Sequence, residues 1–255
     1  MRALLLIVFA VLFAPGAAAA CAAPQRALVL VYHGLGPHRP YWVEPERFEA
    51  DILYLLRRGY HTVSLRQIEG YALHGDRLPE KPVLLTFDDG VESVYRYALP
   101  ITERYKVPSV LFMIGSRIGR PGHLSAAQLR EMQRSGLWSI EAHTYDMHRY
   151  VRGVRGYAAQ MVNPRPLEAP ADRAEAIRQD TASEAKAFCR AGIPQPTAFA
   201  FPFGKHDGPA IALLHAAYPV LFDSRPALAR PREFLLPRLD ATAAPLPKLL
   251  EAYGG

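Results

Sequence analysis

The chain has 255 residues, of which 50% are hydrophobic and 10% aromatic, so it can fill the core of one ordinary α/β domain. Its formal net charge is +6, but the basic residues are scattered, and no run of Lys or Arg indicates nucleic-acid binding. Beyond residues 4–13, no segment is long and apolar enough to cross a membrane as a helix.

The first twenty residues are typical of a secretory signal peptide. Arg2 is the positive n-region, residues 4–13 are apolar, and the alanines at 17–20 suit a cleavage site. We therefore assign 1–20 to a signal peptide and 21–255 to one domain, and expect an exported, periplasmic or extracellular protein. Cys21 follows the alanines directly, as in lipoprotein signals, so membrane anchoring through a lipidated Cys21 is a second interpretation. Ala18 stands where such signals usually have leucine, which favours soluble secretion.

Strand and helix patterns alternate along the rest of the chain. Apolar β-type runs predict strands at 27–32, 83–87, 108–114, 137–142, 197–201 and 220–222. Helical periodicity predicts helices at 45–58, 91–105, 173–190 and 208–217, and a capping box, Ser125 with Gln128, begins another helix at 125. Such alternation predicts parallel strands wrapped by helices. We expect residues 150–170 to form an exposed loop and Cys189 to be a packed thiol.

Two adjacent carboxylates, Asp88 and Asp89, follow the strand at 83–87, and Gly90 comes next. Neighbouring anions repel each other unless a cation or hydrogen bonds compensate them. Successive side chains of an extended chain point to opposite sides, so one carboxylate can hold a metal while the other transfers protons. An ordinary Asp-Asp-Gly turn after a strand is the alternative interpretation.

Other polar residues also follow predicted strands. His33 comes after 27–32, His143 after 137–142, and the turn 202–204 with Phe203 after 197–201. The carboxyl ends of parallel strands meet at one rim, where the active sites of βα barrels form. His148 is five residues from His143, a spacing that is poor on a helix but workable on a loop. Two histidines with one carboxylate would leave open positions on a metal.

His33 is a candidate general acid, and a backbone N–H of the turn 201–204 is a candidate oxyanion donor. A hydrogen-bonded core histidine and a simple proline turn are the corresponding structural interpretations.

Together these residues resemble the polysaccharide deacetylases of carbohydrate esterase family 4. The segment 86–90, Thr-Phe-Asp-Asp-Gly, matches that family's first motif without a change. His143 to His148 resembles its second motif with one extra residue, as in the poly-β-1,6-N-acetylglucosamine deacetylases of bacterial biofilm systems. His33 near the start of the chain and the segment 236–240 are also similar to that subgroup. The resemblance covers roughly residues 27–240.

The resemblance implies a distorted (β/α)₇ barrel and a metal-dependent hydrolase that removes N-acetyl groups from an N-acetylglucosamine polysaccharide. It implies that Asp89, His143 and His148 bind a divalent metal, for which zinc is expected and cobalt, nickel or iron would also suit. It further implies that Asp88 is the general base, that the Phe203 N–H stabilises the oxyanion, and that His33 protonates the departing amine. The family usually has tyrosine where this chain has Phe203.

Two alternatives remain at this point. The same site suits an O-acetyl esterase of the acetylxylan type, because an alcohol leaves more easily than an amine. A non-catalytic glycan-binding protein would lack part of the metal and proton-transfer set, which this chain has in full. Closing of the barrel would bring the last strand beside the first, and with it Arg238 or Asp240 near His33.

Overall fold

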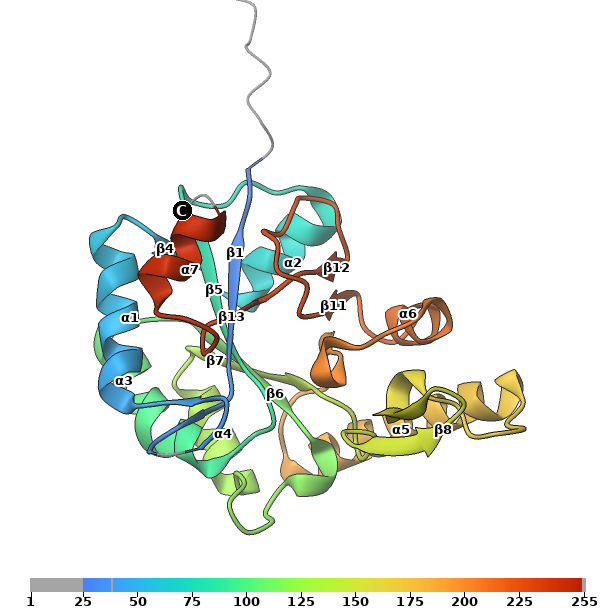
Figure 1. Cartoon of the computed structure of the whole chain (residues 1–255). Coiled ribbons are helices and arrows are strands. Elements are labelled where there is room, and N and C mark those ends of the chain that lie inside the picture. Colours follow the sequence, from blue (N-terminus) through green and yellow to red (C-terminus); the bar gives the residue numbers. More distant parts are fainter. Residues whose placement is uncertain (1–24, 38, 254–255) are drawn as a thin grey trace, which may run out of the picture.

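The computed structural model describes residues 25–37 and 39–253. The expected signal peptide and Cys21 lie outside these residues. The described chain builds one parallel sheet of nine strands, shown in Figure 1. The main path runs β12 (Leu235–Leu236), β11 (Val220–Phe222), β10 (Ala198–Ala200), β7 (Trp138–Ala142), β6 (Ser109–Met113), β5 (Pro82–Phe87), β1 (Leu28–Tyr32) and β13 (Leu239–Asp240), with β4 (His61–Thr62) beside β5.

One short segment closes this sheet into a barrel. Its first half, β12, pairs with β11, and its second half, β13, pairs with β1 through Leu30↔Leu239 and Val31↔Asp240. If β12 and β13 are counted as one interrupted strand and β4 is left out because it lies off the main path, the barrel has seven strand positions. This confirms the expected distorted (β/α)₇ barrel. The last strand lies beside the first, as predicted.

Alternation along the strands decides which side chains enter the barrel. On β5, Val83, Leu85 and Phe87 pack in the outer apolar cluster, whereas Leu84 belongs to the cluster that fills the barrel. Asp88 is four residues beyond Leu84, an even number, so its side chain points to the same side of the strand as Leu84, toward the inside of the barrel. The strand pattern itself therefore aims Asp88 into the mouth of the barrel.

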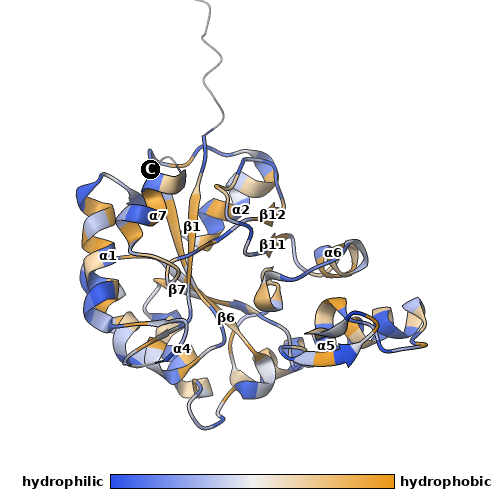
Figure 2. Ribbon diagram, viewed as in Figure 1, coloured by the Kyte–Doolittle hydropathy of each residue, from blue (hydrophilic) through white to orange (hydrophobic). Residues whose placement is uncertain are grey.

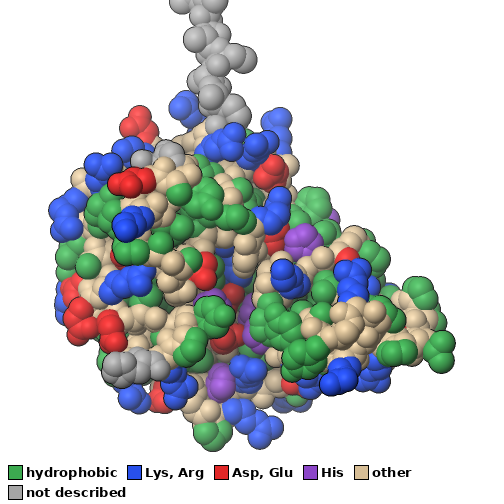
Figure 3. Space-filling model, viewed as in Figure 1, with side chains coloured by type: hydrophobic (Ala, Val, Ile, Leu, Met, Phe, Trp, Pro, Cys, Tyr) green, Lys and Arg blue, Asp and Glu red, His purple; other side chains and the backbone are tan. Residues whose placement is uncertain are grey.

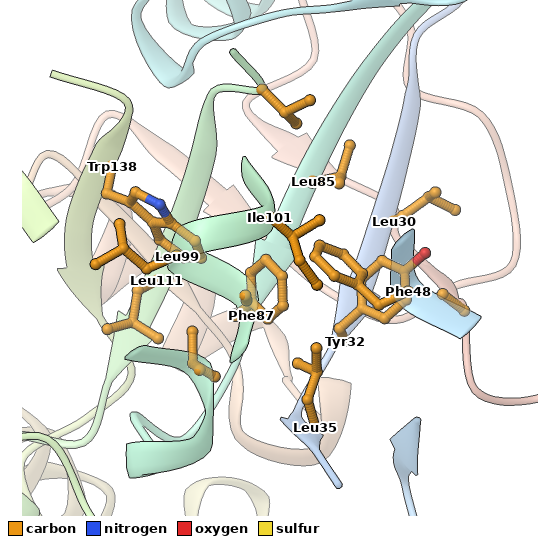
Figure 4. Close-up of a cluster of buried hydrophobic side chains, with 14 of the residues drawn as sticks. Leu30, Tyr32, Leu35, Phe48, Leu85, Phe87, Leu99, Ile101, Leu111 and Trp138 are labelled. Atoms are coloured by element: carbon orange, nitrogen blue, oxygen red, sulfur yellow. The ribbon is translucent and has the colours of Figure 1, made fainter. Parts of the chain in front are cut away.

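Helices cover the outside of the sheet. They are α1 (Pro45–Arg57), α3 (Leu99–Tyr105), α4 (Ala126–Arg134), α5 (Pro170–Ala191), α6 (Gly208–His215) and α7 (Leu246–Tyr253). In Figure 2 the central strands are mostly hydrophobic, whereas the helices around them carry both hydrophilic and hydrophobic residues. Figure 4 shows the centre of the outer cluster. There the rings of Tyr32, Phe48 and Phe87 lie 5.1–5.5 Å apart between centroids. Such pairs add about 0.5–1.5 kcal/mol each beyond their area burial.

The two ends of the barrel are different. Helix α2 (Leu65–His74), which the sequence analysis missed, packs Leu65, Ile68 and Tyr71 against the inner cluster. The Tyr71 hydroxyl donates to the Gln25 carbonyl just before β1, so α2 covers the amino-terminal end of the strands. The carboxyl-terminal end is left open for a site. No helix of the described residues is long and apolar enough to span a membrane.

The predicted capping box is confirmed, since Ser125 caps α4 with Gln128. The helix predicted at 173–190 is confirmed as α5, which ends at Gly192 with φ 68°, a conformation that favours glycine. The predicted helix at 91–105 is split into a π-helical turn, η1 (Val94–Ala98), and α3. Pro100 explains the split, because it lacks the N–H that would continue the α-helical ladder.

Two predictions are wrong. Residues 150–170 are not a loop throughout, since β8 (Tyr150–Gly153) and β9 (Gly156–Ala159) form an antiparallel hairpin. The Asn163 side chain holds this hairpin by donating to the Val151 and Gly156 carbonyls, a contact that apolar periodicity does not reveal. Cys189 is exposed rather than packed, because α5 buries the neighbouring Phe188 instead.

The Asp51 carboxyl group predicts a pH dependence of stability. It is buried on α1 and accepts a hydrogen bond from the Tyr32 hydroxyl. Burial raises the pKa of Asp51 from 3.8 to about 6, outweighing the effects of Arg47 and Tyr32. Between these values the folded protein holds a proton that the unfolded chain has released, so this group lowers the free energy of unfolding as pH rises.

In the Asp51→Asn variant this loss is absent. Its free energy of unfolding minus that of the wild type should rise by about 2 kcal/mol between pH 4 and pH 7. Urea unfolding of both proteins at the two pH values measures the difference. A difference that stays constant would contradict the assigned protonation.

Candidate active site

The open end of the barrel holds a cleft of about 510 Å³. It is lined by all six residues predicted from the sequence, namely His33, Asp88, Asp89, His143, His148 and Phe203. Figure 3 shows histidine and acidic side chains gathered in the hollow between the barrel and the part of the chain that carries α5 and the hairpin. The structure therefore brings the predicted residues to one place.

A tight turn places the second carboxylate. Asp89 and Gly90 both have φ 72°, so the chain leaves the extended conformation directly after Asp88. Only glycine suits position 90, because a Cβ there would lie 2.0 Å from the Met113 sulfur. The sequence analysis attributed the separation of Asp88 and Asp89 to the alternation of side chains along an extended strand, and this explanation is wrong. The turn at Asp89 directs the two carboxylates to different partners.

Asp89, His143 and His148 form a compact group. One ligand atom from each lies within 4.8 Å of the others. Asp89 Oδ1 is 3.3 Å from His148 Nε2 and 3.9 Å from His143 Nε2. Among the described residues this buried Oδ1 has no hydrogen-bond partner. A buried carboxylate oxygen facing two ring nitrogens is costly alone, and a divalent cation would satisfy it.

The backbone fixes the orientation of the His143 ring. Its Nδ1 lies 2.7 Å from the Ala200 carbonyl of β10, which can only accept a hydrogen bond. Nδ1 therefore carries the proton, and the lone pair of Nε2 faces the site. Burial lowers the pKa of His143 to about 4, and burial together with Arg117 lowers that of His148 to about 4. Both rings are neutral at pH 7, as metal ligands must be, so the donor set fits a divalent metal.

Asp88 is bound by a buried arginine. Arg238 Nη1 and Nη2 lie 2.7 and 2.8 Å from its two oxygens, and only 1% of Arg238 is exposed. Burial alone would raise the pKa of Asp88, but the Arg238 charge and then His143 lower it well below its ordinary value. Asp88 is therefore an anion at neutral pH although it is buried.

Arg238 is itself held by the barrel mouth. Its Nε donates to the Asp223 carbonyl, and its Nη1 lies 3.3 Å from the Thr86 hydroxyl. The buried Asp223 carboxylate accepts from Arg225 and lies 3.1 Å from His206 Nε2. The sequence analysis missed Asp223. The signal was present, because Asp223 follows the strand at 220–222 as His33 and Asp88 follow theirs.

His33 lies between β1 and β2 (Gly34–Leu35), and its buried Nδ1 has no hydrogen-bond partner among the described residues. Asp240 lines the same cleft, while Arg238 turns to Asp88 instead. The ring of Trp42, on β3 (Trp42–Val43), packs on Gly34, where a Cβ would lie 2.1 Å from a ring atom. The absence of a side chain at Gly34 thus allows the Trp42 ring to pack against the backbone next to His33.

The turn at Phe203 has an unusual backbone. Phe203 has φ 58° within a short 3₁₀ turn, η4 (Pro202–Gly204), a conformation disfavoured for a bulky residue. Its ring centroid lies 4.3 Å from that of His148 and 4.6 Å from that of Tyr150. The oxyanion role of the Phe203 N–H stays a prediction. The structure adds that its ring borders the candidate metal group.

The Arg238–Asp88 pair allows a direct test. Removing the guanidinium in Arg238→Met leaves a buried carboxylate without its counter-charge, which should lower the free energy of unfolding by about 3–5 kcal/mol. Urea unfolding at pH 7 with a chelator present measures this. Arg178→Met, which removes an exposed guanidinium paired with the exposed Glu175, is the control and should cost less than about 1 kcal/mol. Adding Asp88→Asn to Arg238→Met should restore part of the loss, and equal effects of the two arginine variants would contradict the assignment.

Comparisons with known proteins agree with this geometry. The family model described as "Polysaccharide deacetylase" matches residues 75–218, more than half of the chain. Poly-beta-1,6-N-acetyl-D-glucosamine N-deacetylase of Staphylococcus aureus is 34% identical over 113 residues, which are 42% of this chain and 39% of that protein. The chain thus matches less than half the length of this curated relative.

Two solved structures share the fold. IcaB from Ammonifex degensii has a TM-score of 0.80 and 28% identity, covering 89% of this chain and 96% of its own. A de-N-acetylase from Aggregatibacter actinomycetemcomitans has a TM-score of 0.79 and 24% identity, covering 86% and 97%. With the family match over more than half of its length, this chain belongs to the polysaccharide deacetylase family.

Proposed function

We propose that this protein is a metal-dependent deacetylase that removes N-acetyl groups from an N-acetylglucosamine-containing polysaccharide and releases acetate. One observation carries the proposal: a single cleft holds the neutral-histidine and carboxylate group of Asp89, His143 and His148 together with Asp88 and His33. These are the parts that metal-assisted amide hydrolysis needs. The similarity to a relative named as an N-deacetylase supports the N-acetyl substrate.

Each residue has a role that its surroundings support. A divalent metal held by Asp89, His143 and His148, with zinc the expected ion, would lower the pKa of a water and polarise the acetamide carbonyl. Asp88 accepts the proton of the attacking water, and Arg238 keeps it ionised for that task. The N–H of Phe203 donates to the developing oxyanion. His33 protonates the amine nitrogen, which is a poor leaving group without a proton.

Aromatic side chains make the cleft suitable for a sugar chain. Tyr41, Tyr150 and Phe203 line it, and 68%, 42% and 37% of their respective surfaces are exposed. Tyr157 of the hairpin extends this surface, with its ring centroid 5.7 Å from that of Tyr150. The apolar faces of these exposed rings suit the apolar faces of pyranose rings, and the tyrosine hydroxyls add polar groups at the ring edges. We therefore propose that the polymer crosses the cleft between Tyr41 and the hairpin.

The proposal includes export, which rests on the sequence of residues 1–20 alone. An exported enzyme meets extracellular or cell-surface polysaccharide, and lipidation of Cys21 would hold it at the membrane. Activity measured on a panel of glycans identifies the polymer and its linkage.

Acetate release from a panel of glycans tests the function. Purified mature protein should release acetate from β-1,6-linked N-acetylglucosamine oligomers, lose at least about 100-fold of this activity with a chelator, and regain it with Zn²⁺ or Co²⁺. Acetylated xylan is the comparison substrate, and preference for it would indicate an O-acetyl esterase. Full activity in a sample shown to be free of metal would overturn the mechanism.

His33 has the most discriminating prediction. In His33→Ala, hydrolysis of an N-acetyl substrate should fall by about 10²–10⁴-fold, whereas hydrolysis of an activated aryl acetate should fall much less. The aryl oxide leaves without a proton, and the amine does not. Rates on both substrates are compared with the wild type at equal metal content. An equal loss on the two would show that His33 positions the site rather than donating a proton.

A further inference from the structure

The loop that carries the two histidines is held from a distant helix. Asp180, on α5 and 35 residues beyond Tyr145, accepts hydrogen bonds from the loop through both carboxylate oxygens. Oδ2 accepts from the Tyr145 N–H at 2.8 Å and from the Thr144 hydroxyl at 2.5 Å, and Oδ1 accepts from the Asp146 N–H at 2.9 Å. One side chain therefore satisfies three donors between His143 and His148.

Thr144 links Asp180 to the end of the loop next to His148. Its hydroxyl donates to Asp180 and accepts from the Met147 N–H at 2.9 Å, immediately before His148. Thr144 has φ 76°, which is unfavourable for a β-branched residue, so the surrounding bonds must hold it. The loop conformation is thus imposed by partners, because its own backbone preference opposes it.

The next turn of α5 has a different part. Glu184 is fully buried, accepts from the His143 N–H at 3.3 Å, and its second oxygen has no partner among the described residues. That contact holds the end of β7, where His143 is also held by the Met113 carbonyl. Asp180 instead contacts the residues that lie between the two ligands.

We propose that Asp180 is a positioning residue for the metal site. It holds residues 144–147 in the conformation in which His148, five residues beyond His143, faces Asp89 together with it. The inference rests on the proposed function for the presence of the metal, and on the hydrogen bonds of the loop for the role of Asp180. An amide at position 180 would present an NH₂ group to one of the backbone donors, so Asn cannot replace the carboxylate.

The experiment measures metal binding directly. Zn²⁺ affinity is determined by competition with a chromogenic chelator, and the visible absorption spectrum of the Co²⁺-loaded protein reports the coordination geometry. Asp180→Asn should bind Zn²⁺ about 10–100-fold more weakly and change the Co²⁺ spectrum. Glu175→Gln, at an exposed carboxylate of the same helix paired with Arg178, is the matched control and should match the wild type.

Thr144 provides a second pair of variants should Asp180→Asn fail to fold, which thermal unfolding of the metal-free protein detects. Thr144→Ser keeps the hydroxyl and should keep the Zn²⁺ affinity, whereas Thr144→Val should lose it to a similar degree as Asp180→Asn. Because Asp180 and Thr144 act through one chain of hydrogen bonds, the double variant Asp180→Asn/Thr144→Val should lose little more Zn²⁺ affinity than either single variant.

The outcomes separate this inference from the proposed function. If the wild type binds no Zn²⁺ and releases no acetate, the metal-dependent function and the role of Asp180 both fail. If the wild type binds Zn²⁺ and folded Asp180→Asn binds it equally with an unchanged Co²⁺ spectrum, the inference alone fails. Additive losses in the double variant, or equal loss in Thr144→Ser and Thr144→Val, would also overturn it.

Discussion

The bidentate ion pair between Arg238 and Asp88 connects the closure of the barrel to the chemistry of its mouth. Arg238 lies between β12 and β13, on the segment that joins the two edges of the sheet, and Asp88 ends β5. Burying either charge alone would cost several kcal/mol, so each is acceptable only with the other in place. The same contact keeps Asp88 ionised at neutral pH, as the proposed general base requires.

The two carboxylates of the Asp-Asp-Gly turn avoid mutual repulsion because their surroundings differ. Asp88 is compensated by a guanidinium, whereas Asp89 faces two neutral imidazoles and keeps a buried oxygen free of hydrogen bonds within the described structure. Asp88 therefore has its counter-charge within the protein, whereas Asp89 is available to bind a cation. The backbone turn at Asp89 and Gly90 makes this separation possible.

The site combines a rigid centre with a broad approach. His143 is fixed by the Ala200 carbonyl, and Asp180 holds the loop that leads to His148. Around this centre, aromatic side chains from the β1–β3 region and from the hairpin are exposed at the surface. A preorganised centre in an open, aromatic-lined cleft suits a long polymer, since the chain can lie across the surface without entering a closed pocket.

Local patterns in the sequence determined most strands and helices, and they placed His33, Asp88 and His143 at strand ends that meet at one rim. That was possible because side-chain period, caps and strand-to-rim geometry depend on neighbouring residues and on the parallel arrangement. The roles of Arg238 and Asp180, and the hairpin beyond Tyr150, were decided by tertiary structure. Their partners lie far along the chain, 150 residues away for Arg238 and Asp88, and no local pattern specifies which distant charges meet once the sheet closes.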